Sequence, residues 1–253
     1  MTEKPLSDHR AKVPAVTAGF WAIKILATTL GETGGDTLSM TYDFGYLASS
    51  LIFIVPLILL VAAQVKALRF HPALYWATII ASTTAGTTMA DFATRSLGIG
   101  YLGGSLLLLA SVIASLIAWR GVTGSVAVES VSTPRAELFY WLTITFSQTL
   151  GTALGDWAAD DGGLGYLGGA LAFGSLLLLL VALWRWSGIS RVLLFWAAFI
   201  LTRPLGATVG DFLDKPLAQG GLDLSRSLAS AILASTIAVL IILLPQRSAG
   251  KYA

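Results

Sequence analysis

The chain has 253 residues, of which 55% are hydrophobic and only 12% are charged, and its mean hydropathy is +0.77. A soluble domain is about one-quarter charged, so this composition argues against an ordinary soluble protein and indicates a membrane protein. The absence of cysteine excludes disulfides, iron–sulfur clusters and thiolate zinc sites, and there are only two histidines. The net charge of +2 says little by itself, and we expect no nucleic-acid partner.

One pattern occurs four times along the chain. A Trp is followed by Gly at +10, Asp at +15 and a second Gly at +24 in every copy, and by Tyr at +25 in three of them. The copies begin at Trp21, Trp76, Trp141 and Trp196. Such an internal repeat indicates one structural unit used four times. The middle step is 65 residues against 55 for the other two, which suggests two tandem pairs.

Each repeat contains two apolar stretches of the length that crosses a bilayer, about 20 residues. We therefore predict an all-α transmembrane bundle of about eight spans. The expected spans are 17–39, 45–66, 72–94, 99–120, 136–158, 165–186, 190–212 and 225–245. The first helix of each repeat, which carries the pattern, is called the motif helix. Two spans return the chain to its starting side, so the repeats should be parallel, with pseudo-symmetry about the membrane normal.

The spans divide the chain into a tail (1–16), a first half (17–120), a linker (121–135), a second half (136–245) and a second tail (246–253). Eleven Lys and Arg residues fall on the side that holds the tails and linker, against three on the other, namely Arg95, Lys215 and Arg226. The positive-inside rule then predicts that both termini are cytoplasmic. An aromatic belt at the membrane interface is expected from the tryptophans near that face, namely Trp21, Trp76, Trp119, Trp141, Trp184 and Trp196.

A polar strip is expected along each motif helix. Residues four apart lie near one helix face, and lipid cannot solvate polar groups, so positions +3, +7, +11 and +15 should face the bundle interior. The strips are Lys24, Thr28, Glu32 and Asp36 in repeat 1, Ile79, Thr83, Thr87 and Asp91 in repeat 2, Ile144, Gln148, Thr152 and Asp156 in repeat 3, and Phe199, Arg203, Ala207 and Asp211 in repeat 4.

Acids inside a membrane span are costly and by default mark a functional site. We expect the four motif aspartates and Glu32 to bind an ion or protons, with Thr28, Thr83, Thr87, Gln148 and Thr152 as supporting polar groups. The alternative, with roughly even weight, is that the aspartates cap helix ends.

Counting charge narrows the choice of ligand. Arg203 is the expected counter-ion, and Lys24 either does the same or extends its ammonium towards the cytoplasm. Five core acids against these two bases leave three negative charges, which calls for protons or a bound cation. Carboxylate, hydroxyl and carbonyl oxygens suit Mg²⁺, Ca²⁺ or Mn²⁺, so a metal site formed by the four motif aspartates is the hypothesis.

Glycines recur beside these acids. A Gly inside a helix costs about 1 kcal/mol, so it indicates close packing or a helix break. The glycines are Gly31, Gly86, Gly151 and Gly206 at +10, and Gly35, Gly155 and Gly210 at +14.

The segment GETGGDT (31–37) resembles the acidic motif of Gdt1-type cation/proton exchangers, in which Glu-x-Gly-Asp is followed by a basic residue and then Thr or Ser. The segment has one residue more, the other copies lack the Glu, and those exchangers carry inverted repeats. Over nearly its whole length the chain resembles a family of uncharacterised bacterial membrane proteins with repeated G-D motifs. That resemblance implies a bacterial inner-membrane setting and no particular activity.

The expected function is a membrane transporter or channel for a cation, of the divalent Mn, Ca or Mg type, with proton coupling left open. The alternative is a non-transporting module that senses an ion or binds a partner protein, with the aspartates as structural caps. No nucleophile–His pair or catalytic metal triad is evident, so we expect no enzyme. Membrane lipid and a small cation are the expected partners, a divalent cation is the one cofactor considered, and homo-oligomer formation is left open.

Overall fold

The computed structural model describes residues 11–249. In this part of the chain eight long helices account for the fold: α1 (Ala18–Asp36), α2 (Gly45–Lys66), α3 (Pro72–Asp91), α4 (Tyr101–Thr123), α5 (Pro134–Asp156), α6 (Gly165–Trp186), α7 (Arg191–Asp214) and α8 (Arg226–Leu243). Short π-helical turns continue three motif helices beyond the Asp: η1 (Thr37–Thr41), η2 (Phe92–Ser96) and η4 (Trp157–Asp161). Single 3₁₀ turns, η3 (Val128–Ser130) and η5 (Leu217–Gln219), lie in connections. The all-α prediction is confirmed.

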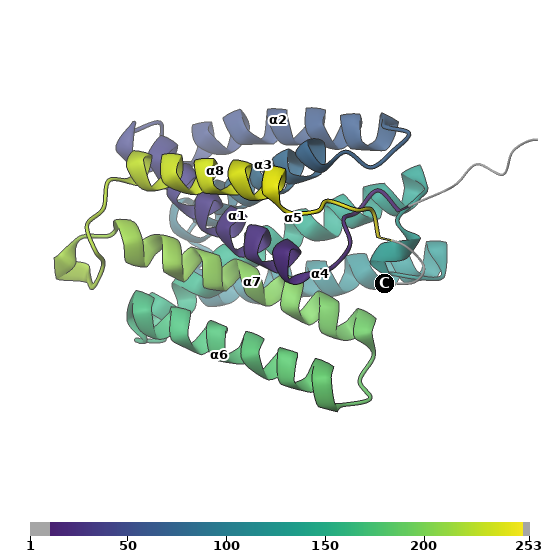
Figure 1. The fold of residues 1–253 in the computed structure, drawn as a ribbon. Helices are drawn as coiled ribbons and strands as arrows, with labels where there is room; N and C mark the ends of the chain where they lie inside the picture. The colour runs from purple at the N-terminus through teal and green to yellow at the C-terminus, as the bar shows by residue number, and fades with distance from the viewer. Residues whose placement is uncertain (1–10, 250–253) are drawn as a thin grey trace, which may run out of the picture.

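The four motif helices form a closed ring. α1 packs against α3 and α7, and α5 packs against the same two helices, so the order around the ring is α1, α3, α5, α7. The second helix of each repeat lies outside, on the motif helix of the next repeat: α2 on α3, α4 on α5, α6 on α7 and α8 on α1 (Figure 1). The last repeat packs against the first in the same way as each earlier repeat packs against the next. The bundle is therefore closed and has fourfold pseudo-symmetry.

Glycine allows the motif helices to approach closely. Each +10 Gly faces the +7 residue of the next repeat, and the +14 glycines face +11 residues. The pairs are Gly31 with Thr83, Gly86 with Gln148, Gly151 with Arg203, Gly206 with Thr28, Gly35 with Thr87, Gly155 with Ala207, and Gly210 with Glu32. The helices run unbroken through these glycines, so their role is close packing. The same offset at every interface shows that the motif helices are parallel, as predicted.

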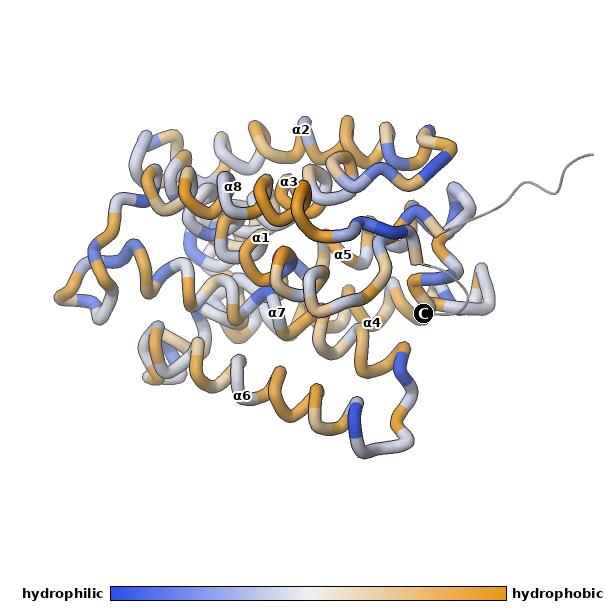
Figure 2. The backbone as a smooth tube through the Cα atoms, viewed as in Figure 1, coloured by the Kyte–Doolittle hydropathy of each residue, from blue (hydrophilic) through white to orange (hydrophobic). Residues whose placement is uncertain are grey.

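Five helices, α2, α4, α6, α7 and α8, are long and apolar enough to cross a membrane. The helices α1, α3 and α5 have similar lengths of 19, 20 and 23 residues, but their polar strips lower their hydropathy. Apolar residues predominate along the outer helices α2 and α6 (Figure 2). These features fit a membrane protein. The eight spans, their boundaries and their orientation stay predictions.

The two ends of the ring are named here after the motif residues they hold, the Trp end and the Asp end. At the Trp end, Trp76, Trp119, Trp141 and Trp196 are at most 3% exposed, whereas Trp184 is 55% exposed. The expected aromatic belt is therefore wrong for those four residues. Their rings instead pack on one another and on Tyr75 and Tyr140, and form an aromatic cluster inside the bundle.

Segments outside the helices cover the Trp end. The backbone N–H of Lys12 donates to the carbonyl of Val131 at 3.0 Å, and the Lys12 ammonium lies 2.7 Å from the Glu137 carboxylate. The N–H of Ala15 donates to the carbonyl of Arg247 at 2.8 Å. Parts of both predicted tails thus pack against the bundle and against the predicted linker. The rest of those tails, residues 1–10 and 250–253, lies outside the described residues.

Candidate functional site: the aspartate layer

Arg203 lies at the centre of the ring. Its side chain is fully buried, and Nη2 donates to Glu32 Oε2 at 2.8 Å and to Thr87 Oγ1 at 2.5 Å. The same nitrogen also donates to Thr152 Oγ1. These three partners occupy position +11 of the other three repeats. One guanidinium from repeat 4 therefore fills the axis of the ring and is ion-paired with one of the five expected acids.

The supporting threonines join neighbouring motif helices. Thr28 Oγ1 donates to the Thr202 carbonyl at 3.1 Å, and Thr87 Oγ1 donates to the Gly31 carbonyl at 3.0 Å. Thr83 Oγ1 likewise lies 3.2 Å from a carbonyl oxygen of α1. These bonds satisfy hydroxyls that lipid cannot solvate. Gln148 is fully buried and has no hydrogen-bond partner for its amide within residues 11–249.

The four motif aspartates lie at one end of the ring and are no more than 3% exposed. The alternative that they cap helices has no support from the geometry. Asp36, Asp91 and Asp156 directly precede the π turns, and none of them makes a side-chain cap hydrogen bond there. Their carboxylates face basic side chains instead.

Lys215 joins the aspartates of repeats 4 and 1. Its Nζ lies 2.7 Å from Asp36 Oδ2 and 2.9 Å from Asp211 Oδ1. Burial alone would lower the pKa of Lys215, but the carboxylates of Asp211 and Asp36 raise this pKa well above its usual value. The side chain therefore lies between the carboxylates of two neighbouring motif helices.

Arg95 joins the aspartates of repeats 2 and 3, as Lys215 joins those of repeats 4 and 1. Its Nε lies 3.0 Å from Asp91 Oδ1 and its Nη2 lies 3.2 Å from Asp156 Oδ2. Arg95 and Lys215 occupy the same position, +19, in alternate repeats. Each base sits one helical turn beyond the aspartate of its own repeat and reaches the aspartate of the next.

These pairs change the expected charge balance. The layer at the Asp end holds five carboxylates, because Asp214 joins the motif aspartates and lies 3.3 Å from Arg226. It also holds three bases, Arg95, Lys215 and Arg226, so it carries two excess negative charges. Deeper in the ring lie one acid, Glu32, and two bases, Arg203 and Lys24. The core as a whole has six acids against five bases, and the expected excess of three negative charges is wrong.

Lys24 departs from both of its expected roles. Its side chain is fully buried, so it does not extend towards a membrane face, and Nζ has no hydrogen-bond or ion-pair partner within residues 11–249. The ammonium instead lies 4.2 Å from the ring centroid of Phe199. The other residues at position +3 are apolar, which is why this layer offers the ammonium an aromatic face and no carboxylate.

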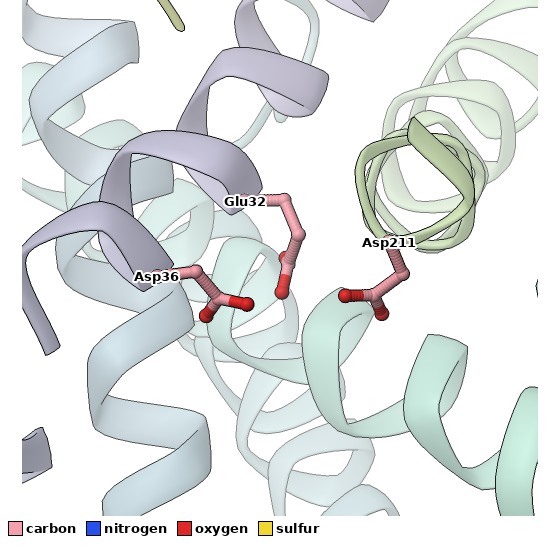
Figure 3. Close-up of side chains that lie close together, drawn as sticks. All are labelled: Glu32, Asp36 and Asp211. Carbon is pink, nitrogen blue, oxygen red and sulfur yellow. The ribbon is translucent and has the colours of Figure 1, made fainter. Parts of the chain in front are cut away.

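Three carboxylates converge on the side of the ring where α1 meets α7. Glu32, Asp36 and Asp211 each offer an oxygen within 4.8 Å of the other two, and all three residues are buried (Figure 3). Asp36 Oδ1 is buried, and no residue from 11 to 249 forms a hydrogen bond with it. Hard cations prefer such oxygen ligands. The predicted metal set of four aspartates is corrected here, because Asp91 and Asp156 are outside this group and Glu32 is in it.

Fold and site together define a class, an α-helical membrane protein with four two-helix repeats in a ring around a buried polar core. The comparison of the chain with protein families gives the family itself. The chain belongs to the family described as "Repeat of Unknown Function (DUF347)", which matches residues 19–70, 74–124, 139–190 and 194–247. The four matched units coincide with the four repeats of the ring. No curated protein and no solved structure matches the chain.

Proposed function

We propose that the protein is a membrane carrier for a cation, with a preference for a divalent one. The observation that supports this function is the convergence of Glu32, Asp36 and Asp211, three buried carboxylates from two helices with oxygens within 4.8 Å of one another. The layer at the Asp end, which holds Asp36 and Asp211 but not Glu32, has two excess negative charges, and one divalent cation would balance them. Buried charge of one sign is costly unless it is compensated, so the layer favours a cation or protons.

A carrier fits the geometry better than an open channel. The guanidinium of Arg203 occupies the axis next to the carboxylates, and the aromatic cluster and chain segments cover the Trp end. An ion bound at the Asp end would therefore need a rearrangement of the ring to reach the other side. We further propose that the membrane is the bacterial inner membrane, with both termini in the cytoplasm and the Asp end outside, because most Lys and Arg residues lie at the Trp end.

The binding part of the proposal is tested by cation-dependent thermal unfolding of the purified protein in detergent. A ligand of the folded state raises its stability by about 2.7 kcal/mol at 100 times the Kd. At constant ionic strength, Mg²⁺, Ca²⁺ or Mn²⁺ should raise the Tm of the wild type. Glu32→Gln, Asp36→Asn and Asp211→Asn should abolish this rise, whereas Asp91→Asn and Asp156→Asn should keep it. Absence of stabilisation by every cation tested, from mildly acidic to mildly basic pH, would contradict the proposal.

The second candidate is a non-transporting module that senses a cation. The covered Trp end favours it, because neither the aromatic cluster nor the segments above it leave the axis open. Uptake of the stabilising cation into proteoliposomes distinguishes the two functions. A carrier moves the ion, and Asp36→Asn stops it. A sensor shows the same Tm rise in detergent and no uptake above protein-free vesicles.

A further inference from the structure

The aspartate layer consists of two half-sites related by a pseudo-twofold axis. In one half-site, Lys215 bridges the aspartates of repeats 4 and 1, at 2.7 and 2.9 Å. In the other, Arg95 bridges the aspartates of repeats 2 and 3, at 3.0 and 3.2 Å. In each half-site a positive charge attached to the chain already sits between two carboxylates, where a free cation would bind.

The two half-sites differ in their third ligand. Next to Lys215 the +11 position supplies Glu32, whose carboxylate completes the group of three. Next to Arg95 the +11 positions supply Thr87 and Thr152, whose hydroxyls accept from Arg203. The half-site at Lys215 therefore has three carboxylates, and the half-site at Arg95 has two.

The two bases also hold their aspartates differently. Lys215 uses one ammonium nitrogen for both contacts, so a single atom occupies the space between the carboxylates. Arg95 uses two nitrogens of a planar fork, one for each aspartate. Asp36 Oδ1 at the Lys215 half-site is buried and has no hydrogen-bond partner in the part of the chain that the structure describes. A cation that replaced the ammonium would find this oxygen free to bind it.

We propose that the Lys215 ammonium is a tethered occupant of the cation site, and that it and the free cation occupy the position between Asp36 and Asp211 in turn, with Glu32 as a third ligand of the free cation. This inference rests on the proposed cation binding. When the ammonium leaves, the three carboxylates keep two basic neighbours, Arg203 at 2.8 Å from Glu32 and Arg226 at 3.9 Å from Asp36. The group therefore retains an excess of negative charge, which favours a cation in place of the ammonium. The Asp214 carboxylate, 4.0 Å from Nζ, offers the displaced ammonium another partner. The Arg95 half-site stays closed by its own base.

The test compares the cation concentration needed for half of the Tm rise in the wild type, Lys215→Met and the matched control Arg95→Met. The probes are MgCl₂, CaCl₂ and MnCl₂, at ionic strength held constant with choline chloride. Removing the competing ammonium should lower this concentration by about tenfold or more, which corresponds to about 1.4 kcal/mol. Arg95→Met should leave it at the wild-type value. Lys215→Arg, which keeps the charge and enlarges the head group, should raise it, and this variant serves if Lys215→Met does not fold.

The outcomes separate this inference from the proposed function. If no cation stabilises the wild type or any variant, the proposed function falls and the inference falls with it. If cations stabilise the wild type but bind Lys215→Met no more tightly, the ammonium does not compete and only the inference falls. An equal gain in Arg95→Met would show that the half-sites are equivalent, which also overturns the inference.

Discussion

Closure of the ring between the last and first repeats depends on the absence of a side chain at Gly206. A Cβ built there would lie 2.6 Å from Thr28 Cβ and 2.7 Å from the Thr28 carbonyl carbon. Non-bonded carbons prefer about 3.5–4.0 Å, so α7 and α1 would have to separate by about 1 Å. Overpacking of this kind costs about 1–3 kcal/mol. The substitution Gly206→Ala also gains about 1 kcal/mol of helix propensity, which offsets only part of that cost.

A matched control isolates the packing term. Gly174 lies inside α6, and a Cβ there would meet no atom within 4 Å, so Gly174→Ala should gain the propensity term alone. We therefore expect Gly206→Ala to be less stable than Gly174→Ala by about 1–3 kcal/mol. Thermal unfolding in detergent, followed by Trp fluorescence, measures the difference. Equal Tm values for the two variants would refute the reasoning that glycine contacts fix the ring.

Three more predictions follow from the buried charges and the orientation. Lys24→Met should raise the Tm by the equivalent of about 1–3 kcal/mol, because the buried ammonium has no acceptor among the described residues. Lys12→Met should lower the Tm by breaking the pair with Glu137, and a lower Tm in Lys24→Met would contradict the reasoning. Arg203→Met should lower the free energy of unfolding by about 3–5 kcal/mol, because it leaves the Glu32 carboxylate unpaired. The double variant with Glu32→Gln should recover most of that stability. A double variant as unstable as the single one would refute the pairing. Asp161→Cys should react with a membrane-impermeant thiol reagent in intact cells and Glu129→Cys should not, and the reverse pattern would overturn the orientation.

Most of the fold could be predicted from the fourfold sequence repeat. The fixed offsets of Gly and Asp from Trp predicted four equivalent units and the inward-facing polar strip. The two apolar stretches in each unit predicted the number of helices and their parallel arrangement. Ring closure did not follow, since spacing along a chain does not say that α8 packs on α1. That contact depends on how the outer helices pack on the ring, which the repeat period of the sequence does not specify.

The bases of the aspartate layer were missed for a specific reason. The positive-inside count treated Arg95 and Lys215 as loop residues beyond the membrane. In the structure a π turn extends α3 past Asp91 and keeps Arg95 on the inner face, and Lys215 directly follows α7. The signal was present, because +19 is one further step of four from +15 along the strip. Extending the strip by one turn would have found both bases and removed most of the charge excess.

The departures from fourfold symmetry explain where a site can form. Four identical repeats would place four buried aspartates around one axis with no compensating charge, which is unstable in a low-dielectric interior. Arg95 and Lys215, at +19 of repeats 2 and 4, each pair with two of the four aspartates. This pairing lowers the cost of burying the aspartates and leaves a twofold arrangement. A single further substitution, Glu32 at +11 of repeat 1, then makes the two halves unequal, and Arg203 of the neighbouring helix α7 pairs with this carboxylate. The repeats supply the scaffold, and the interface between the last and first repeats is where the surplus carboxylate makes cation binding favourable.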